Sequence, residues 1–349
     1  MWMHAMLMSM TLSCWQTGIN RAVLWSFDNM YSEEECWTQM RFQKSDLILL
    51  STELAIDAGR GFIRTAGSGS VFQPIEALVV FLTRMAYPNR WEDKIKFLGG
   101  RARGAYVEAF YYVLDFIYDN FKHCITDITR WAGNMDEWAD AIHAAGAPAP
   151  RCVGFIDGTF RPCARPGGPN INQRQVYSGY KKLHGIKFQS VTSVNGLIVD
   201  FFGSAVGRRG DGYLLRKSHF LVRMAALCAL EGSPFYVYGD PAYSLSQYIL
   251  RGYKGAMTPQ QQAFRTAMSS VRESVEWGFD LIVRDWAFVD YRKNLKIHKQ
   301  PIGRLYFVAA LLTNMKTCIT AAHTFDYHGN QISQMFGVSP PSLHDYLYA

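Results

Sequence analysis

Three acidic side chains in the C-terminal half have types and spacing suited to holding divalent metal ions. Asp157 follows the apolar run 153–156, Asp240 follows the segment PFYVYG, and Glu276 lies in SVRESVEWGF. Magnesium prefers oxygen ligands and is usually bound through one or two carboxylates together with waters. Two such ions about 4 Å apart can activate an attacking water and stabilise the leaving oxygen of a phosphodiester. The three carboxylates therefore indicate metal-dependent phosphodiester chemistry.

The hydrophobic pattern after residue 150 predicts the elements that would bring these acids together. The expected strands are one within 152–160 that ends in a turn, 185–194, 197–204, one within 234–243 that stops at the turn Gly239-Asp240-Pro241, and a short one at 254–258; the expected helices are 213–230, 244–250 and 259–284. Asn195-Gly196 lies between two apolar runs and predicts a hairpin, and Pro259 suits a first helical turn. This order predicts an α/β fold, a ribonuclease H-like mixed sheet with flanking helices.

Asp157 and Asp240 are each predicted to end a strand, and strand ends of such sheets are where ligand sites gather. Each is followed by a turn residue, Gly158 or Pro241, so each carboxylate could instead cap a turn. Glu276 could be a solvated helical residue paired with Arg272 four positions earlier. Glu273, one turn before Glu276, is the rival for the third position.

The N-terminal region, residues 1–145, is predicted to be all helical. Residues 33–57 have helical periodicity, and three further stretches follow at 74–86, 91–98 and 103–121. The short GGRARG joint between the last two resembles the turn of a helix-turn-helix. One interpretation of residues 74–121 is a DNA-contacting module with Arg101 and Arg103 near phosphate; the other is an ordinary helical bundle. The segment AAGAPAPR at 144–151 predicts a domain boundary.

The positive charge is concentrated after this boundary. Residues 1–150 hold 13 Lys or Arg and 17 acids, whereas residues 151–349 hold 23 and 12, so the chain's net charge of +7 comes from its second half. Two long runs without acids, 158–199 and 291–325, flank the carboxylates. Such runs indicate a phosphate track for DNA, although any one of these side chains could simply be solvated. The residues expected to contact DNA are Arg161, Arg165, Arg174, Lys181, Lys182, Lys187, Arg208 and Arg209.

An ordered set of motifs resembles the catalytic domain of PIF/Harbinger-type DDE transposases. FIDGT, YSGYKKLHGIKFQSV, NGLI, GRRGD, YGDPAY and VEWGF occur in that order, followed by IGRLYFVAALLTNM, and 35 residues separate Asp240 from Glu276. The resemblance implies a nuclease domain at 150–325 followed by a tail at 326–349. It also implies Asp157, Asp240 and Glu276 as the catalytic and metal-binding triad, with Mg²⁺ or Mn²⁺ as cofactor.

The reaction that the resemblance implies is nicking of double-stranded DNA at transposon ends, followed by attack of a 3′-hydroxyl on target DNA. The family also implies nuclear localisation and a Myb-like accessory protein, and paired-end chemistry suggests a homodimer. Many members carry His-Asp where this chain has Gly210-Asp211, so this chain lacks an imidazole that could contact phosphate or metal.

Two other functions stay open. The chain could be a non-catalytic, transposase-derived DNA-binding protein, or a ribonuclease H-like enzyme that acts on RNA. The seven cysteines include no CxxC pair, so neither a zinc module nor a disulfide framework is indicated. The apolar first 15 residues lack the features of a secretory signal and are shorter than a membrane span of about 20 residues. An intracellular protein without membrane contact is therefore expected.

Overall fold

The computed structural model describes residues 25–167, 173–273, 277–293, 295–321, 323 and 330–349, without the side chains of Glu273 and Trp277. The chain divides into two compact units, Met1–Asp119 and Asn120–Ala349. The predicted boundary at 144–151 lies inside the second unit, between a helix and the first strand of the large sheet. None of the described helices is both long enough and apolar enough to cross a membrane.

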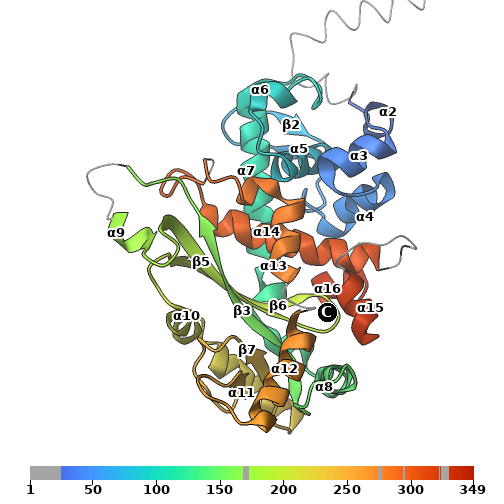
Figure 1. The fold of residues 1–349 in the computed structure, drawn as a ribbon. Coiled ribbons are helices and arrows are strands. Elements are labelled where there is room, and N and C mark those ends of the chain that lie inside the picture. Colours follow the sequence, from blue (N-terminus) through green and yellow to red (C-terminus); the bar gives the residue numbers. More distant parts are fainter. Residues whose placement is uncertain (1–24, 168–172, 274–276, 294, 322, 324–329) are drawn as a thin grey trace, which may run out of the picture. The chain divides into compact units, whose positions relative to one another are not determined.

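The first unit is mainly helical, as its periodicity predicts. Its elements are α2 (Phe27–Met30), α3 (Glu33–Met40), α4 (Lys44–Leu54), the two-stranded sheet of β1 (Ile63–Arg64) and β2 (Val71–Phe72), α5 (Pro74–Ala86), α6 (Trp91–Lys94) and α7 (Arg103–Phe121) (Figure 1). The bounds predicted for α5 and α7 are confirmed. The helix predicted over 33–57 is in fact two helices, because Arg41 adopts a left-handed conformation (φ 69°) that ends α3. The helix predicted over 91–98 is a single turn, α6.

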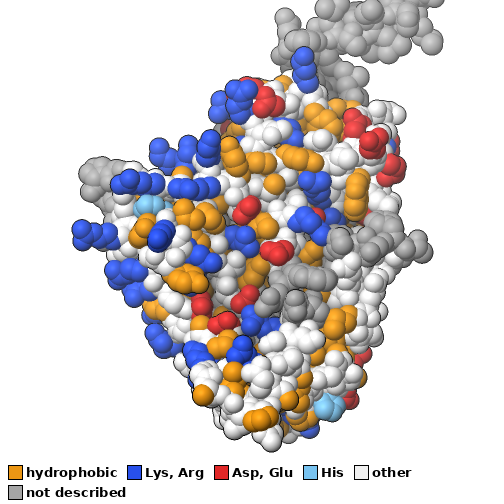
Figure 2. Space-filling view, viewed as in Figure 1, with side chains coloured by type: hydrophobic (Ala, Val, Ile, Leu, Met, Phe, Trp, Pro, Cys, Tyr) orange, Lys and Arg blue, Asp and Glu red, His pale blue; other side chains and the backbone are white. Residues whose placement is uncertain are grey.

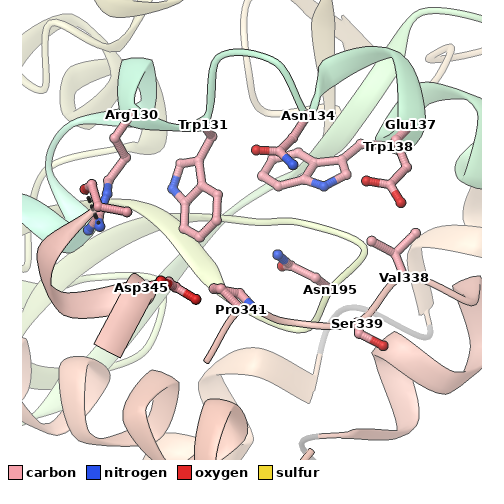
Figure 3. A pocket seen from close by; sticks show the side chains of 11 residues that line it. Arg130, Trp131, Asn134, Glu137, Trp138, Asn195, Val338, Ser339, Pro341 and Asp345 are labelled. Carbon is pink, nitrogen blue, oxygen red and sulfur yellow. Dashed lines mark hydrogen bonds between the residues drawn. The ribbon is translucent and has the colours of Figure 1, made fainter. Parts of the chain in front are cut away.

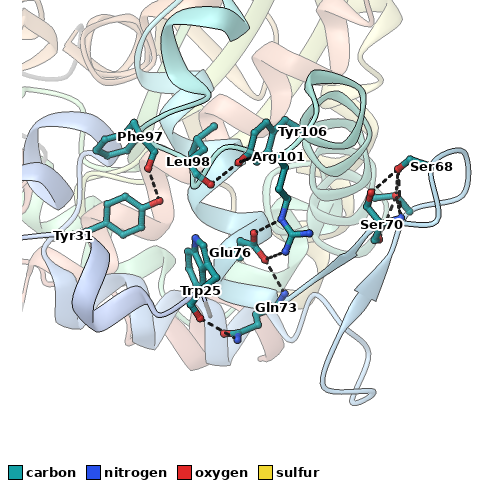
Figure 4. Close-up of polar contacts among 11 residues, drawn as sticks. Trp25, Tyr31, Ser68, Ser70, Gln73, Glu76, Phe97, Leu98, Arg101 and Tyr106 are labelled. Atoms are coloured by element: carbon teal, nitrogen blue, oxygen red, sulfur yellow. Dashed lines mark hydrogen bonds and ion pairs between the residues drawn. The ribbon is translucent and has the colours of Figure 1, made fainter. Parts of the chain in front are cut away.

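Arg101 belongs to the core of the first unit, so the expectation that it lies near phosphate is wrong. Its Nε and Nη2 donate to the two carboxylate oxygens of Glu76 at 2.7 and 3.0 Å, and its backbone N–H donates to the Tyr106 hydroxyl at 2.9 Å (Figure 4). The Glu76 side chain is 1% exposed. Because Glu76 is buried, its bidentate partner Arg101 also lies inside the protein, 9% exposed. The GGRARG joint therefore serves the packing of the helices at this point.

The second unit contains a six-stranded mixed sheet. Its strands are β3 (Cys152–Pro162), β4 (Tyr177–Ser178), β5 (Leu183–Thr192), β6 (Ile198–Val206), β7 (Tyr236–Gly239) and β8 (Ile249–Arg251). β5 lies between β3 and β6 and is antiparallel to both, whereas β3, β7 and β8 run parallel to one another. The hairpin predicted at Asn195-Gly196 is confirmed, since Thr192 pairs with Ile198 across it.

Helices cover both faces of this sheet (Figure 1). The described α-helices of this unit are α8 (Met135–Ala144), α9 (Gln173–Val176), α10 (Asp211–Lys217), α11 (Phe220–Glu231), α12 (Pro259–Glu273), α13 (Trp277–Asp285), α14 (Ile302–Thr320), α15 (Asn330–Phe336) and α16 (Leu343–Tyr348). On one face Phe188 of β5 stacks on Tyr306 of α14, with ring centroids 4.3 Å apart. On the other face, Gln189 donates to Ser218, between α10 and α11. This arrangement confirms the predicted α/β class and is consistent with a ribonuclease H-like fold.

Several predicted elements differ from the structure. Residues 244–250 do not form a helix, and the strand predicted at 254–258 is instead β8, at 249–251. The helix predicted over 213–230 is divided into α10 and α11, with His219 in a left-handed conformation between them. The predicted tail is part of the second unit, because the Tyr346 hydroxyl of α16 accepts a hydrogen bond from Asn314 of α14.

Candidate metal centre and DNA-facing surface

Asp157 and Asp240 lie on neighbouring parallel strands. Ile156 of β3 pairs with Gly239 of β7, so the two aspartates each stand one residue beyond this pair. Adjacent strands are about 4.8 Å apart, and residues at equivalent positions of paired strands share a face. The strand register is therefore compatible with the expected convergence of the two carboxylates. Asp240 directly follows β7, as predicted.

Asp157 does not end its strand, so that part of the prediction is wrong. β3 continues for five more residues, to Pro162, and Asp157 pairs with Ser190 of β5. Gly158, which the sequence suggests as a turn residue, is thus an extended strand residue. A Cβ atom at Gly158 would come within 2.9 Å of Oδ1 of Asp211. Glycine leaves room there for an acidic side chain of α10 that approaches the strand closely.

Asp240 also performs the simpler role that its position suggests. Its Oδ1 accepts a hydrogen bond from the backbone N–H of Ala242 at 2.6 Å, which shapes the turn after β7. An ionised carboxylate has lone pairs for several partners, so turn capping and metal binding are compatible.

α12 approaches the same face of the sheet. Near the end of this helix, Nη2 of Arg272 lies 3.5 Å from Oδ1 of Asp157. One turn earlier, Ser269 is hydrogen-bonded to the hydroxyl of Tyr238 in β7. The predicted third carboxylate, Glu276, lies outside the described residues, and α12 ends at its rival Glu273, whose side chain is likewise not described.

Asp211 adds a further carboxylate near this centre. Nζ of Lys187 in β5 lies 3.0 Å from its Oδ1, and the two side chains keep 18% and 26% of their surface exposed. In the sequence, Asp211 stands out as the retained half of a family motif, but its proximity to Gly158 of β3 is seen only in the structure. Lys187, which is expected from its sequence context to contact DNA, holds this carboxylate in place.

Tyr243 is a functional candidate that the sequence did not single out. Its side chain is 2% exposed, and its hydroxyl has no hydrogen-bond partner among the described residues. Burial raises the pKa of this phenol well above its ordinary value, and the negative charges of Asp211, Asp157 and Asp240 raise it further. Tyr243 therefore stays protonated and offers a hydrogen-bond donor beside these carboxylates. In the sequence, only its position three residues after Asp240 suggested that it could lie near the site.

The residues present fit a hard divalent cation. Asp157 and Asp240 supply adjacent carboxylate oxygens, which match the donor type and the small number of acids that magnesium requires. The buried Tyr243 hydroxyl, without a partner in the described part of the chain, is a polar group available to a bound water or ligand. Within the described residues, no set of three His, Cys, Asp or Glu side chains surrounds one point.

The eight predicted DNA-contacting residues divide into six that are exposed and two, Arg161 and Lys187, that are paired with acids of the protein. Six are exposed: Arg165, Arg174, Lys181, Lys182, Arg208 and Arg209. Arg161 is 11% exposed, pairs with Asp290 and lies over the ring of Tyr306, so its main contacts are within the protein. Figure 2 shows Lys and Arg side chains gathered over the edge of the second unit that carries α9 and α10. The six exposed residues are called the basic edge below.

A cavity of about 310 Å³ elsewhere in the second unit has different chemistry (Figure 3). Trp131 and Trp138 line it, with ring centroids 5.6 Å apart, and Asn195 and Pro341 stand opposite. Its Asp345 accepts a hydrogen bond from the Ser342 hydroxyl, whose oxygen accepts one from the Asp345 N–H, at the start of α16. This wall is aromatic, and of the two acids that line it, Glu137 and Asp345, the second caps a helix, so the cavity does not resemble a metal centre.

One of three comparisons with known proteins finds a match. Comparison with curated proteins and with solved structures gave no match. One family model does match: the stretch begins one residue before Asp157 and includes Asp211, Asp240 and Tyr243. Residues 156–314 thus match the family described as DDE superfamily endonuclease, which indicates a transposase-like nuclease domain in this chain.

Proposed function

We propose that residues 150–325 form a metal-dependent DNA endonuclease of the PIF/Harbinger transposase type, which cuts and joins phosphodiester bonds at transposon ends. The observation that supports the proposal is the register of β3 and β7, in which Asp157 and Asp240 each follow the pair of Ile156 and Gly239 by one residue. The match over residues 156–314 supports the nuclease class.

The acids and their neighbours have distinct roles in this proposal. Asp157 and Asp240, together with Glu276, would hold Mg²⁺ or Mn²⁺. The bound ions would lower the pKa of water and stabilise charge on the leaving oxygen. Arg272 orients Asp157 from α12, at 3.5 Å. Tyr243, which stays protonated, donates a hydrogen bond to an oxygen that enters the site.

The basic edge would hold double-stranded DNA. Its six cations are exposed and no acid occurs between Gly158 and Val199, so phosphates meet little repulsion along this surface. As further parts of the same proposal, the protein acts in the nucleus, as a homodimer that pairs two DNA ends, with a Myb-like accessory protein.

The test is nicking of a supercoiled plasmid by the full chain, with Mn²⁺, with Mg²⁺ and with EDTA. We expect metal-dependent nicking by the wild type and none by Asp240→Asn, because an amide lacks the anionic oxygen that a hard cation needs. Asp136→Asn is the matched control, since Asp136 is 73% exposed and pairs with Arg151. DNA binding without metal-dependent nicking by the wild type would instead support a non-catalytic, transposase-derived DNA-binding protein.

A further inference from the structure

A second cavity of the same unit adjoins strand β3. It has a volume of about 500 Å³ and is lined by Gly158–Phe160 of β3, residues 178–181 of the hairpin between β4 and β5, residues 207–211, and Lys187 of β5. Pockets that enclose small ligands measure roughly 300–1,000 Å³. The cavity is therefore large enough for a small molecule or for one unit of a polymer.

The position of the cavity relative to Asp157 follows from the strand pairing. Gly158 pairs with Gln189 and Asp157 with Ser190, so the two residues face opposite sides of the sheet. β7 pairs with β3 only up to Ile156. Among the described residues, β3 beyond Asp157 thus has no strand partner on the β7 side. A single strand of DNA that leaves the carboxylates could therefore follow β3 to the cavity.

The lining of the cavity favours an anion. Lys181, Arg208 and Arg209 are exposed at its walls, and its acid, Asp211, is paired with Lys187 at 3.0 Å. The guanidinium of Arg209 lies over the ring of Tyr213, 4.6 Å from its centroid, which restrains its position. Exposed cations around a hollow of this size are suited to bind phosphate groups.

Tyr180 supplies an aromatic surface at the same place. It lies in the four-residue turn 179–182 that joins β4 to β5, and its side chain is 90% exposed. The neighbouring Lys181 lies over its ring, 5.4 Å from the centroid. Because the Tyr180 ring is 90% exposed, it contributes little to packing within the protein. It matches the stacking platforms that proteins use for unpaired bases, where each base–aromatic stack contributes about 1–3 kcal/mol.

We propose that this cavity takes one unpaired nucleotide of DNA, with the base stacked on Tyr180 and the phosphate held by Lys181, Arg208 and Arg209. The proposal rests on the proposed function, because it assigns the nucleotide to a strand that leads from the cleavage site. It adds a preference for DNA with a single-stranded extension over blunt duplex.

The test compares Tyr180→Ala with Tyr180→Phe in the full chain, in EDTA so that no cleavage is needed. The probes are a blunt duplex and the same duplex with a short single-stranded extension that carries 2-aminopurine. Tyr180→Ala should weaken binding of the extended duplex about tenfold, the equivalent of about 1.4 kcal/mol, and abolish quenching of 2-aminopurine. Tyr180→Phe should retain both, and blunt-duplex affinity should change less than about twofold.

Tyr253→Ala is the matched control, because Tyr253 is a 43% exposed tyrosine that does not line the cavity. Equal losses by Tyr180→Ala on both probes, or no loss on either, would overturn the nucleotide site while leaving the nuclease proposal intact. Failure of the wild type to bind either DNA would overturn both. Normal Tyr180-dependent binding without any metal-dependent nicking would overturn the nuclease proposal alone.

Discussion

Each unit contains a contact between an acid and an arginine, and the two contacts differ in burial and in distance. Glu76 and Arg101 are 1% and 9% exposed and share two hydrogen bonds, at 2.7 and 3.0 Å. Asp157 and Arg272 approach only to 3.5 Å, and Asp157 keeps 37% of its side chain exposed. The first acid is neutralised inside the protein. The second stands beside Asp240, at an edge that solvent and solutes can reach.

The difference shows why sequence context alone misjudges such residues. Arg101 follows two glycines in a basic joint, a context that predicts contact with phosphate, yet it completes a buried ion pair. Desolvated charges require a partner within the protein, so a buried Arg101 without Glu76 would be costly. The Asp157 side chain is 37% exposed, so water solvates its charge and a close ion pair is not required. A cation could reach the carboxylate by the same route as water.

The largest expected effect is on cleavage by Asp157→Asn. We expect nicking to fall to background while the free energy of unfolding stays within about 0.5 kcal/mol of wild type, since this acid is partly solvated and lies among other carboxylates. Plasmid nicking and urea denaturation on the same preparation measure both. Wild-type nicking by a folded Asp157→Asn protein would remove Asp157 from the metal centre.

The third carboxylate is tested by comparing Glu276→Gln with Glu273→Gln. Glu276 has the family-like context VEWGF and apolar neighbours, whereas Glu273 lies beside Arg272 and Ser274. We expect Glu276→Gln to eliminate nicking and Glu273→Gln to reduce it less than about tenfold, a barrier change near ~1.4 kcal/mol. The opposite ranking in two folded variants would assign the third position to Glu273.

Disrupting the buried pair of Glu76 and Arg101 should lower the free energy of unfolding. Arg101→Ala leaves the Glu76 carboxylate buried without its guanidinium and should destabilise the protein by about 3–5 kcal/mol. Arg103→Ala is the matched control, because Arg103 and Glu92 are 64% and 55% exposed and such pairs contribute about 0–1 kcal/mol. Denaturant unfolding measures both. Similar small effects from the two variants would show that Arg101 is not structurally required.

A third acid, Asp200, should make stability depend on pH. It is fully buried beside Arg223, and burial raises the pKa of Asp200 to about 7, against the opposing effect of Arg223. Because the folded state holds this proton more tightly than the unfolded chain, stability should fall as pH rises from about 4 to about 7. The slope is at most about 1.4 kcal/mol per pH unit. Asp200→Asn should flatten it, and parallel wild-type and mutant curves in denaturation at several pH values would contradict the assignment.

The smallest expected effect concerns the basic edge. Reversing the charges of Lys181 and Lys182 should weaken DNA binding on all sequences and lower the slope of log affinity against log salt by roughly 0.9 for each phosphate that the protein no longer neutralises. Arg151→Glu, an exposed residue outside the basic edge, should leave the slope unchanged. Salt titrations of fluorescence anisotropy measure it. An unchanged slope in the double variant would place the DNA elsewhere.

Local sequence signals were enough to predict much of the second unit. The Asn195-Gly196 hairpin, Pro259 at the start of α12 and the strand before Asp240 all depend on neighbouring residues, and all three are confirmed. Helix ends were less predictable. α3 ends because Arg41 adopts a left-handed conformation, and no glycine marks that position. Similarly, β8 has three residues, too few for periodicity to distinguish it from the helix expected at 244–250.

The α/β class, the main strands and the identity of Asp157 and Asp240 as acids next to apolar strands could all be predicted, because they depend on residue type and on periodicity along the chain. Which charges meet was settled by tertiary packing alone. Arg101 finds Glu76 across 25 residues, Lys187 finds Asp211, and Tyr243 becomes buried beside the carboxylates. Burial and ion pairing depend on what packs from distant parts of the chain, so a charged residue's own neighbours in sequence do not reveal whether it faces water, a core or a ligand.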